Sequence, residues 1–164
     1  MSTLGHAPRL VGVYRSEDLP RGSRDVTVAL WRVADPGNVG TMIRTADAFG
    51  AAVSLSAECA DPLAPRALRA TAGAIFRVPL VGWGEASEAR GIALVAHGGE
   101  PLADVDLSPP LTFYLGSERE GLPDDLVTQC HKATIPTPGD AESLNVAAAG
   151  AIALYELSRR AASS

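Results

Sequence analysis

Short apolar runs alternate along the chain with longer segments in which apolar residues recur at helical spacing. Continuous apolar runs rich in β-branched residues are typical of strands that are buried on both faces. Six such strands are predicted, at residues 26–33, 51–55, 75–81, 92–96, 111–115 and 132–135. Helical spacing predicts helices at residues 39–49, 62–72, 85–90 and 123–130, and an alanine-rich helix that opens at residues 142–145 and closes the chain.

This alternation predicts an α/β fold, with a mostly parallel sheet of about six strands and helices on both faces. In sheets of this kind, ligands bind beyond the carboxyl ends of the strands. Four of the predicted strand ends carry polar loops rich in glycine or proline, at residues 35–40, 97–99, 116–121 and 136–143. We therefore expect a ligand site where these loops meet.

The alanine-rich helix is apolar almost all round, which predicts burial on more than one face, in the core or in a subunit interface. Thr137, Asp140 and Ser143 are candidate N-caps, because each side-chain oxygen can accept from an unpaired backbone N–H. Ser143 and Asn145 place polar groups at the start of this buried helix. A polar mouth on a buried helix is typical of a small-ligand site.

The length of 164 residues indicates one domain, residues 26–164, preceded by an N-terminal arm, residues 1–25, with no independent domain. The chain has no run of about 18 apolar residues and no signal-peptide pattern at its start, so we expect a cytoplasmic protein without a membrane partner. The net charge of −5 argues weakly against a nucleic-acid partner, although arginines can still form a local basic face.

Several common kinds of site are unsupported by the sequence. Cys59 and Cys130 show no metal-ligand spacing, and the two cysteines and three histidines are scattered along the chain, which predicts reduced thiols and no metal site. No G-x-G-x-x-G follows the first strand, and no G-K-[ST] occurs, so ordinary dinucleotide and P-loop sites are not expected. His97-Gly98-Gly99 is similar to the oxyanion loop of lipases, but the chain lacks the G-x-S-x-G of those enzymes.

Two loops can be interpreted in two ways each. Asn38 lies at a helix start and Arg44 follows about one and a half turns later. They are either a capping residue with a surface ion pair, or an arginine directed at phosphate. Residues 116–121 form either a tight turn with solvated charges, or a loop in which bare backbone at Gly116 approaches a ligand while Glu118 accepts hydrogen bonds.

Three short motifs follow one another in the chain: Asn38-x-Gly40-x-x-x-Arg44, then Gly116-Ser117-Glu118-x-x-Gly121-Leu122, then Ile135-Pro136 with Ser143-Leu144-Asn145-Val146. Together they resemble the SpoU (TrmH-like) branch of the SPOUT methyltransferases, over residues 26–157. The resemblance implies a methyltransferase domain with a deep C-terminal trefoil knot and a homodimer. It also implies S-adenosylmethionine bound in the knot, and methyl transfer to a ribose 2′-hydroxyl of tRNA or rRNA.

The resemblance also implies roles for individual residues. The methyl donor would lie against Val95, Ala96, His97, Gly98, Leu115, Gly116, Ile135, Ser143 and Leu144. Arg44 matches the family's catalytic arginine, and its polar active-site partners match Asn38, Glu118, Ser143 and Asn145. Among these, Asn38 would fix Arg44 and Glu118 would hold its loop.

Other interpretations stay open at this point. One is a catalytically silent dimeric RNA-binding module with the same fold, and another is a flavodoxin-like nucleotide binder. Residues 1–25 are too few for the separate RNA-binding domain that many relatives carry, so the sequence leaves open how RNA is recognised.

Overall fold

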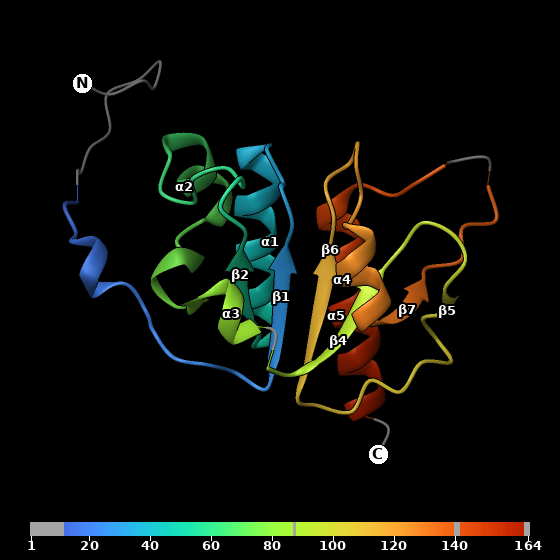
Figure 1. Ribbon diagram of the computed structural model, residues 1–164. Helices are drawn as coiled ribbons and strands as arrows, with labels where there is room; N and C mark the ends of the chain where they lie inside the picture. Colours follow the sequence, from blue (N-terminus) through green and yellow to red (C-terminus); the bar gives the residue numbers. More distant parts are fainter. Residues whose placement is uncertain (1–11, 87, 140–141, 163–164) are drawn as a thin grey trace.

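In the computed structural model, which describes residues 12–86, 88–139 and 142–162, seven strands form one sheet in which every pairing is parallel (Figure 1). The strands are β1 (Val26–Leu30), β2 (Ala52–Leu55), β3 (Leu80–Val81), β4 (Arg90–Leu94), β5 (Glu100–Pro101), β6 (Leu111–Leu115) and β7 (His131–Thr134). Their order across the sheet is β3-β2-β1-β6-β4-β7-β5. The predicted parallel α/β fold is confirmed, with one strand more than the six expected.

Helices cover both faces of this sheet. They are α1 (Pro36–Phe49), α2 (Pro65–Thr71), α3 (Trp83–Ala86), α4 (Asp124–Gln129) and α5 (Val146–Ala161), with short 3-10 turns η1 (Ser16–Asp18) and η2 (Ala74–Phe76). Successive residues of a strand point to opposite faces. Val28 and Leu30 of β1 accordingly join the main core with α1 and α5, whereas Ala29 joins a smaller cluster with α3 and α4. Figure 1 shows α4 and α5 on opposite sides of the sheet.

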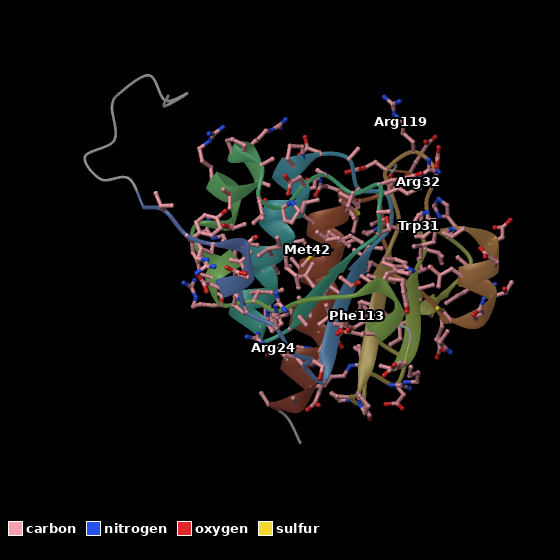
Figure 2. The ribbon with its side chains drawn as sticks, turned by 60° about the vertical axis from the view of Figure 1, so that its left-hand side comes forward. Arg24, Trp31, Arg32, Met42, Phe113 and Arg119 are labelled. Carbon is pink, nitrogen blue, oxygen red and sulfur yellow. The ribbon has the colours of Figure 1, made fainter. Side chains whose placement is uncertain are left out.

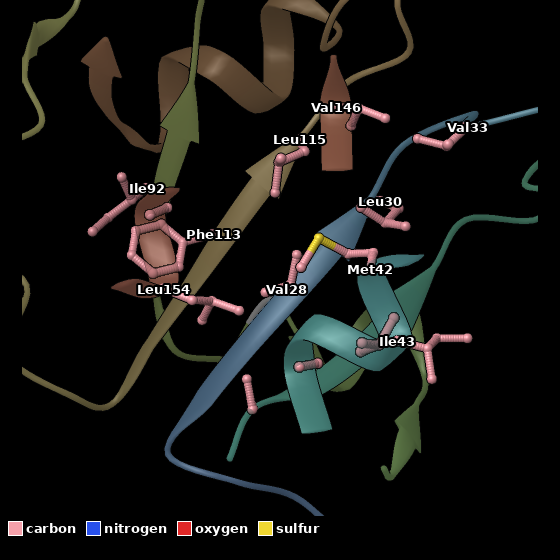
Figure 3. Close-up of a cluster of buried hydrophobic side chains, with 14 of the residues drawn as sticks. Val28, Leu30, Val33, Met42, Ile43, Ile92, Phe113, Leu115, Val146 and Leu154 are labelled. Atoms are coloured by element: carbon pink, nitrogen blue, oxygen red, sulfur yellow. The ribbon is translucent and has the colours of Figure 1, made fainter. Parts of the chain in front are cut away.

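The main core lies between the sheet and the pair α1–α5. Figure 3 shows Met42 of α1 reaching across β1 into a group of side chains that includes Phe113 and Leu154. At the contact between the two helices, a Cβ on Gly150 would overlap the sulfur of Met42. The small residues of α5 therefore allow a close helix crossing, and they explain the alanine-rich composition that the sequence shows.

Burial of α5 is one-sided within this chain. Val146, Gly150 and Leu154 face the core, whereas the side chains of Ile152 and Tyr155 are 39% and 59% exposed. The predicted burial on more than one face is thus met on the inner face only. Of the described part of the chain, no helix is long and apolar enough to cross a bilayer.

Two element predictions are wrong. The strand expected at 75–81 is observed only at Leu80–Val81, which pairs with β2, because the segment begins in the 3-10 turn η2 and continues through irregular chain. Ala72 and Gly73 adopt left-handed backbone angles, φ 49° and 86°, which prevent an extended chain there, and Ile75 is buried from the turn instead. The helix expected at 85–90 is the single turn α3, and Arg90 already begins β4.

Smaller differences occur at element ends. The α1 helix begins at Pro36, inside the predicted turn, because the Asp35 side chain accepts from the Asn38 N–H and proline suits the first helical position. It ends at Gly50 with φ 70°, as predicted.

The unpredicted β5 is a two-residue edge strand that contains Pro101, and proline is tolerated at sheet edges. The predicted N-terminal arm is described from residue 12 onward, and it packs Leu19 against the core.

Candidate active site

A cavity of about 490 Å³ opens at the carboxyl ends of β4, β6 and β7. The loops after these strands and the first turn of α5 line it with Leu94, Val95, Ala96, His97, Leu115, Gly116, Ser117, Glu118, Arg119, Glu120, Gly121, Leu122, Asp124, Val127, Lys132, Ile135, Thr137, Glu142, Ser143, Leu144, Val146 and Ala149. Of the residues predicted to hold the methyl donor, all except Gly98 lie on this lining. Segments far apart in the sequence thus meet at the predicted edge of the sheet.

The cavity combines apolar walls with carboxylates. Its deep wall includes the buried Leu115 and Val146, whereas Glu118, Glu120 and Glu142 lie on exposed parts of the loops. Apolar walls accept an aromatic ring, and carboxylates in the lining favour a positive charge. The site is therefore suited to a small ligand that carries both.

Gly116 lies in a tight turn at the cavity wall. A Cβ on Gly116 would overlap the backbone of Gly121 and Leu122. The same loop is closed by the Gly121 N–H, which donates to the Ser117 carbonyl at 3.0 Å, while Gly121 itself has φ 66°. Glycine is thus required at position 116 because the loop folds against itself. The tight-turn interpretation holds here, and the turn forms one wall of the cavity.

Three polar side chains join the elements around the cavity. The Asn145 Nδ2 donates to the Asn38 Oδ1 at 3.1 Å, and the Asn38 Nδ2 donates to the Glu118 Oε1 at 2.5 Å. The Asn145 Oδ1 also accepts from the Ala147 and Ala148 N–H groups, which caps α5. One hydrogen-bonded chain therefore fixes the starts of α1 and α5 to the loop after β6.

The expected caps of α5 differ from the observed one. Asn145 is the N-cap, whereas Thr137 and Ser143 line the cavity instead. Asp140, the third candidate, lies outside the described residues. The helix consequently starts at Val146, after the predicted opening at residues 142–145.

Arg44 lies apart from this chain of hydrogen bonds. Its side chain is exposed on α1, is absent from the cavity lining, and makes no hydrogen bond or ion pair with the described residues. Within this chain the Asn38 amide is engaged by Glu118 and Asn145, so the expected role of Asn38 in fixing Arg44 stays a prediction. The alternative expectation, a surface ion pair for Arg44, is not met.

Sequence reasoning missed Arg32, which follows β1. Its backbone φ is 53°, and its N–H donates to the Ser56 Oγ at 2.9 Å. Its guanidinium pairs with Glu58 and, at 2.6 Å, with Glu120 of the loop after β6. These partners lie 26 and 88 positions away in the chain, so no local pattern could have indicated them.

A second cavity of about 540 Å³ lies beside the first, and the loop after β6 contributes to both. Its lining is Arg32, Ala34, Asp35, Glu58, Ser117, Glu118, Arg119 and Glu120. No group of three or more potential metal ligands occurs among the residues that the structure describes. Cys59 and Cys130 are free, and burial raises the pKa of the Cys130 thiol.

The fold and the site together define an α/β protein with a cavity suited to a small ligand at the carboxyl edge of a parallel sheet, between loops from the second half of the chain. Comparison with known sequences gives the family. The SpoU rRNA Methylase family matches residues 25–155, so the chain belongs to this family.

Named relatives act on RNA. A 23S rRNA (uridine(2479)-2'-O)-methyltransferase of Streptomyces viridochromogenes is 34% identical over 145 residues, covering 79% of this chain and 50% of that protein. The crystal structure of the SpoU methyltransferase AviRb from the same organism, in complex with AdoMet, has a TM-score of 0.80 and 30% identity, covering 92% of this chain and 66% of that one.

Another similar structure, of a shorter chain, concerns methylation of tRNA. A structure that describes 2-OH methylation of C/U34 on tRNA has a TM-score of 0.78 and 28% identity, and it covers 85% of this chain and 97% of that one. In contrast, the chain spans about half the length of the curated relatives that it matches.

Proposed function

We propose that this protein transfers a methyl group from S-adenosylmethionine to a ribose 2′-hydroxyl of tRNA or rRNA. Family membership and the RNA-methylating relatives support this activity. The main support for this activity is the arrangement of the loops. The predicted donor-binding loops meet in one cavity, and the chain Asn145–Asn38–Glu118 lies beside them. Because tRNA and rRNA are found in the cytoplasm, we expect the protein to work there.

The residues of the first cavity fit the proposed methyl donor. Its volume of about 490 Å³ is within the usual range for a cofactor site. Leu94, Leu115 and Ile135 offer apolar surface for an adenine ring, and Glu118 and Glu142 offer negative charge for a sulfonium. When bound, the cofactor supplies an electrophilic methyl group on positively charged sulfur.

The chain's own residues have to orient the ribose and assist loss of its proton. A guanidinium stays protonated in proteins, so Arg44 is not the base. We propose instead that Arg44 binds an RNA phosphate and stabilises the developing alkoxide, while the phosphate or a water molecule takes the proton. Asn38 and Asn145 position the Glu118 carboxylate, and Ser143 contributes a hydroxyl to the cavity wall.

We further propose that residues 26–164 form the methyltransferase domain, and that the C-terminal part of this domain is threaded into the trefoil knot of the family. The sheet order supports this, because β4 lies between β6 and β7 and the segment after β7 reaches the loops after both β4 and β6 in one cavity. An experimental density map that traces residues 131–146 without a threaded loop would contradict it.

A homodimer is also proposed. Its support is the exposed face of α5, where Ile152 and Tyr155 lie outside the core of the single chain. Arg44 is exposed on the neighbouring helix α1, and α1 and α5 pack together. In this arrangement Arg44 reaches the RNA from outside its own chain's cavity.

The function is tested by methyl transfer and by Arg44→Ala. With tritiated S-adenosylmethionine and bulk bacterial RNA, we expect the wild-type protein to label RNA, and reverse-transcription stops to mark a 2′-O-methyl site. Arg44→Ala should remove most transfer, because the phosphate contact and alkoxide stabilisation are lost, while calorimetry shows unchanged cofactor binding.

Arg44→Lys is the matched control, since it retains the charge without the planar fork, and it should retain partial activity. Full activity of Arg44→Ala, or loss of its cofactor binding, would contradict the role of Arg44. Absence of any label with the wild-type protein would contradict the function itself.

A further inference from the structure

Arg119 stands at the tip of the loop that separates the two cavities. The loop is closed at its base by the hydrogen bond from Gly121 to Ser117, and the Glu120 N–H donates to the Ser117 Oγ at 3.2 Å. Glu118, Arg119 and Glu120 form the exposed tip. An arginine between two glutamates is ordinarily expected to pair with one of them, and here it does not.

Both neighbouring carboxylates are engaged by other residues. Glu118 accepts from Asn38, and Glu120 accepts from Arg32 at 2.6 Å. Arg32 is itself held in place, because its N–H is bonded to Ser56 and its left-handed backbone is one that residues other than glycine adopt only when their surroundings hold them. The two glutamates are consequently drawn toward the start of α1 and the end of β1.

The consequence is a guanidinium without a protein partner. Arg119 makes no hydrogen bond or ion pair with any residue in the described ranges, and it lines both cavities. Figure 2 shows its side chain directed away from the body of the protein, beyond Arg32. Its five N–H donors are therefore available at the mouth of the candidate active site.

We propose that Arg119 binds a phosphodiester group of the substrate RNA beside the target ribose. This inference rests on the proposed function. A guanidinium fork matches the geometry of phosphate oxygens. Because the whole chain carries a net charge of −5, attraction of RNA has to be local, and a cation freed from its own acidic neighbours provides it. The other available anion, the carboxylate of the methyl donor, is distinguished by the experiment.

The test compares Arg119→Ala with the wild-type protein in the tritiated-methyl assay. We expect KM for RNA to rise about tenfold with kcat little changed, and the slope of log affinity against log salt to fall by about one. The dissociation constant for S-adenosylmethionine should stay unchanged. Arg119→Lys should recover part of the RNA affinity, since it keeps the charge.

Arg90→Ala is the matched control. It removes the same charge from an exposed arginine, but Arg90 pairs with Asp106 at the amino end of β4, away from the cavity. Its KM for RNA should equal that of the wild-type protein. An equal rise in KM for Arg90→Ala, or an unchanged KM for Arg119→Ala, overturns the inference, and so does a loss of cofactor affinity in Arg119→Ala.

A second pair of variants tests the arrangement around Arg119. Arg32→Gln releases Glu120, which can then capture Arg119, so KM for RNA should rise by a similar factor. Arg32→Gln combined with Glu120→Gln removes the capturing carboxylate and should restore KM toward the wild-type value. If the double variant is no better than Arg32→Gln while its cofactor binding and melting temperature are normal, the arrangement is wrong.

The two proposals fail in different ways. A wild-type protein that labels no RNA contradicts the proposed function, and with it this inference. A wild-type protein that labels RNA, with an Arg119→Ala variant that matches it in KM and salt dependence, contradicts only the inference.

Discussion

Single residues around the site serve more than one purpose. Asn145 caps α5 with its oxygen and donates to Asn38 with its nitrogen, so one side chain both starts a helix and joins the hydrogen bonds that lead to Glu118. Gly116 acts in the opposite way, because the loop can close only where the residue has no side chain. In both cases the residue type follows from a specific backbone contact.

Gly116→Ala should be strongly disruptive. The added methyl overlaps backbone atoms of Gly121 and Leu122, which cannot move aside as a flexible side chain could, so the loop has to open. We expect a loss of about 2 kcal/mol in the free energy of unfolding and a large loss of cofactor affinity. Urea denaturation and calorimetry with S-adenosylmethionine measure the two effects.

Gly139→Ala is the control, since a Cβ there meets no atom within 4 Å and the backbone is not left-handed. It should change neither quantity. A Gly116→Ala protein with wild-type cofactor affinity would show that the tight turn is dispensable for the cavity.

At this scale the sequence predicted identities better than contacts. The residues at the cavity were predicted from the resemblance of three motifs to the SpoU family, which depends on residue type and order and not on contacts. The bond between Arg32 and Glu120 could not be foreseen, because it depends on β1 and β6 lying side by side. The free position of Arg119 depends on that same bond.

Among the elements, α5 is tied down at both ends. At its C-terminal end, Arg160 donates to the carbonyl oxygens of Leu102 and Val105 at 2.7 and 2.6 Å. Glu156, one turn earlier, accepts from both Arg159 and Arg160. The hydrogen bonds from Arg159 and Arg160 lower the pKa of Glu156 from an ordinary 4.5 to about 2.

This lowered pKa predicts acid sensitivity at the end of α5. A carboxyl whose pKa is lower in the folded state contributes stability above its unfolded pKa, and it loses that contribution as the pH falls. The contribution of Glu156 should therefore be complete above about pH 4.5 and vanish toward pH 2. Glu156→Gln should be less stable than the wild-type protein at pH 7, and the difference should shrink across this window.

Urea denaturation at several pH values measures the stability difference between Glu156→Gln and the wild-type protein. Glu85→Gln, on the exposed turn α3, is the control. If the stability difference between Glu156→Gln and the wild-type protein stays constant from pH 6 to pH 2, the ion pairs of Glu156 contribute nothing to folding.

Element predictions succeeded where the chain is buried on both sides. The strand at 111–115 was predicted with its observed bounds, because all five residues are buried and the run is bounded by proline and glycine. The failure at 75–81 arose because a short apolar run fits a strand and a buried turn equally well. The 3-10 turn η2 follows two residues with left-handed backbone, Ala72 and Gly73, and alanine gives no sequence signal for that conformation.

The whole molecule presents an apolar face on α5 that its own core leaves uncovered. If this face forms the proposed homodimer, Tyr155→Asp should place an unpaired charge in the interface and raise the dissociation constant of the dimer. Sedimentation velocity at micromolar concentration is the measurement. We expect a wild-type dimer and a mostly monomeric Tyr155→Asp protein.

Val13→Asp is the matched control, because it places the same charge on an apolar residue that is 96% exposed on the N-terminal arm. It should leave the dimer intact. A wild-type protein that sediments as a monomer would contradict the homodimer, without bearing on the cavity of the single chain.

The class of fold was predictable from the alternation of elements, but the order of strands was not. Periodicity reports which residues are buried, and it carries no information about which strands become neighbours. The placement of β1 between β2 and β6 is a property of the complete chain.

That central placement has a consequence during synthesis. β1 can pair with β2 soon after both leave the ribosome, but its other edge waits for β6, about eighty residues later, or roughly 4–16 s at ordinary translation rates. For that interval the nascent chain presents an unpaired, strongly apolar strand edge, which is the kind of surface that holdase chaperones shield.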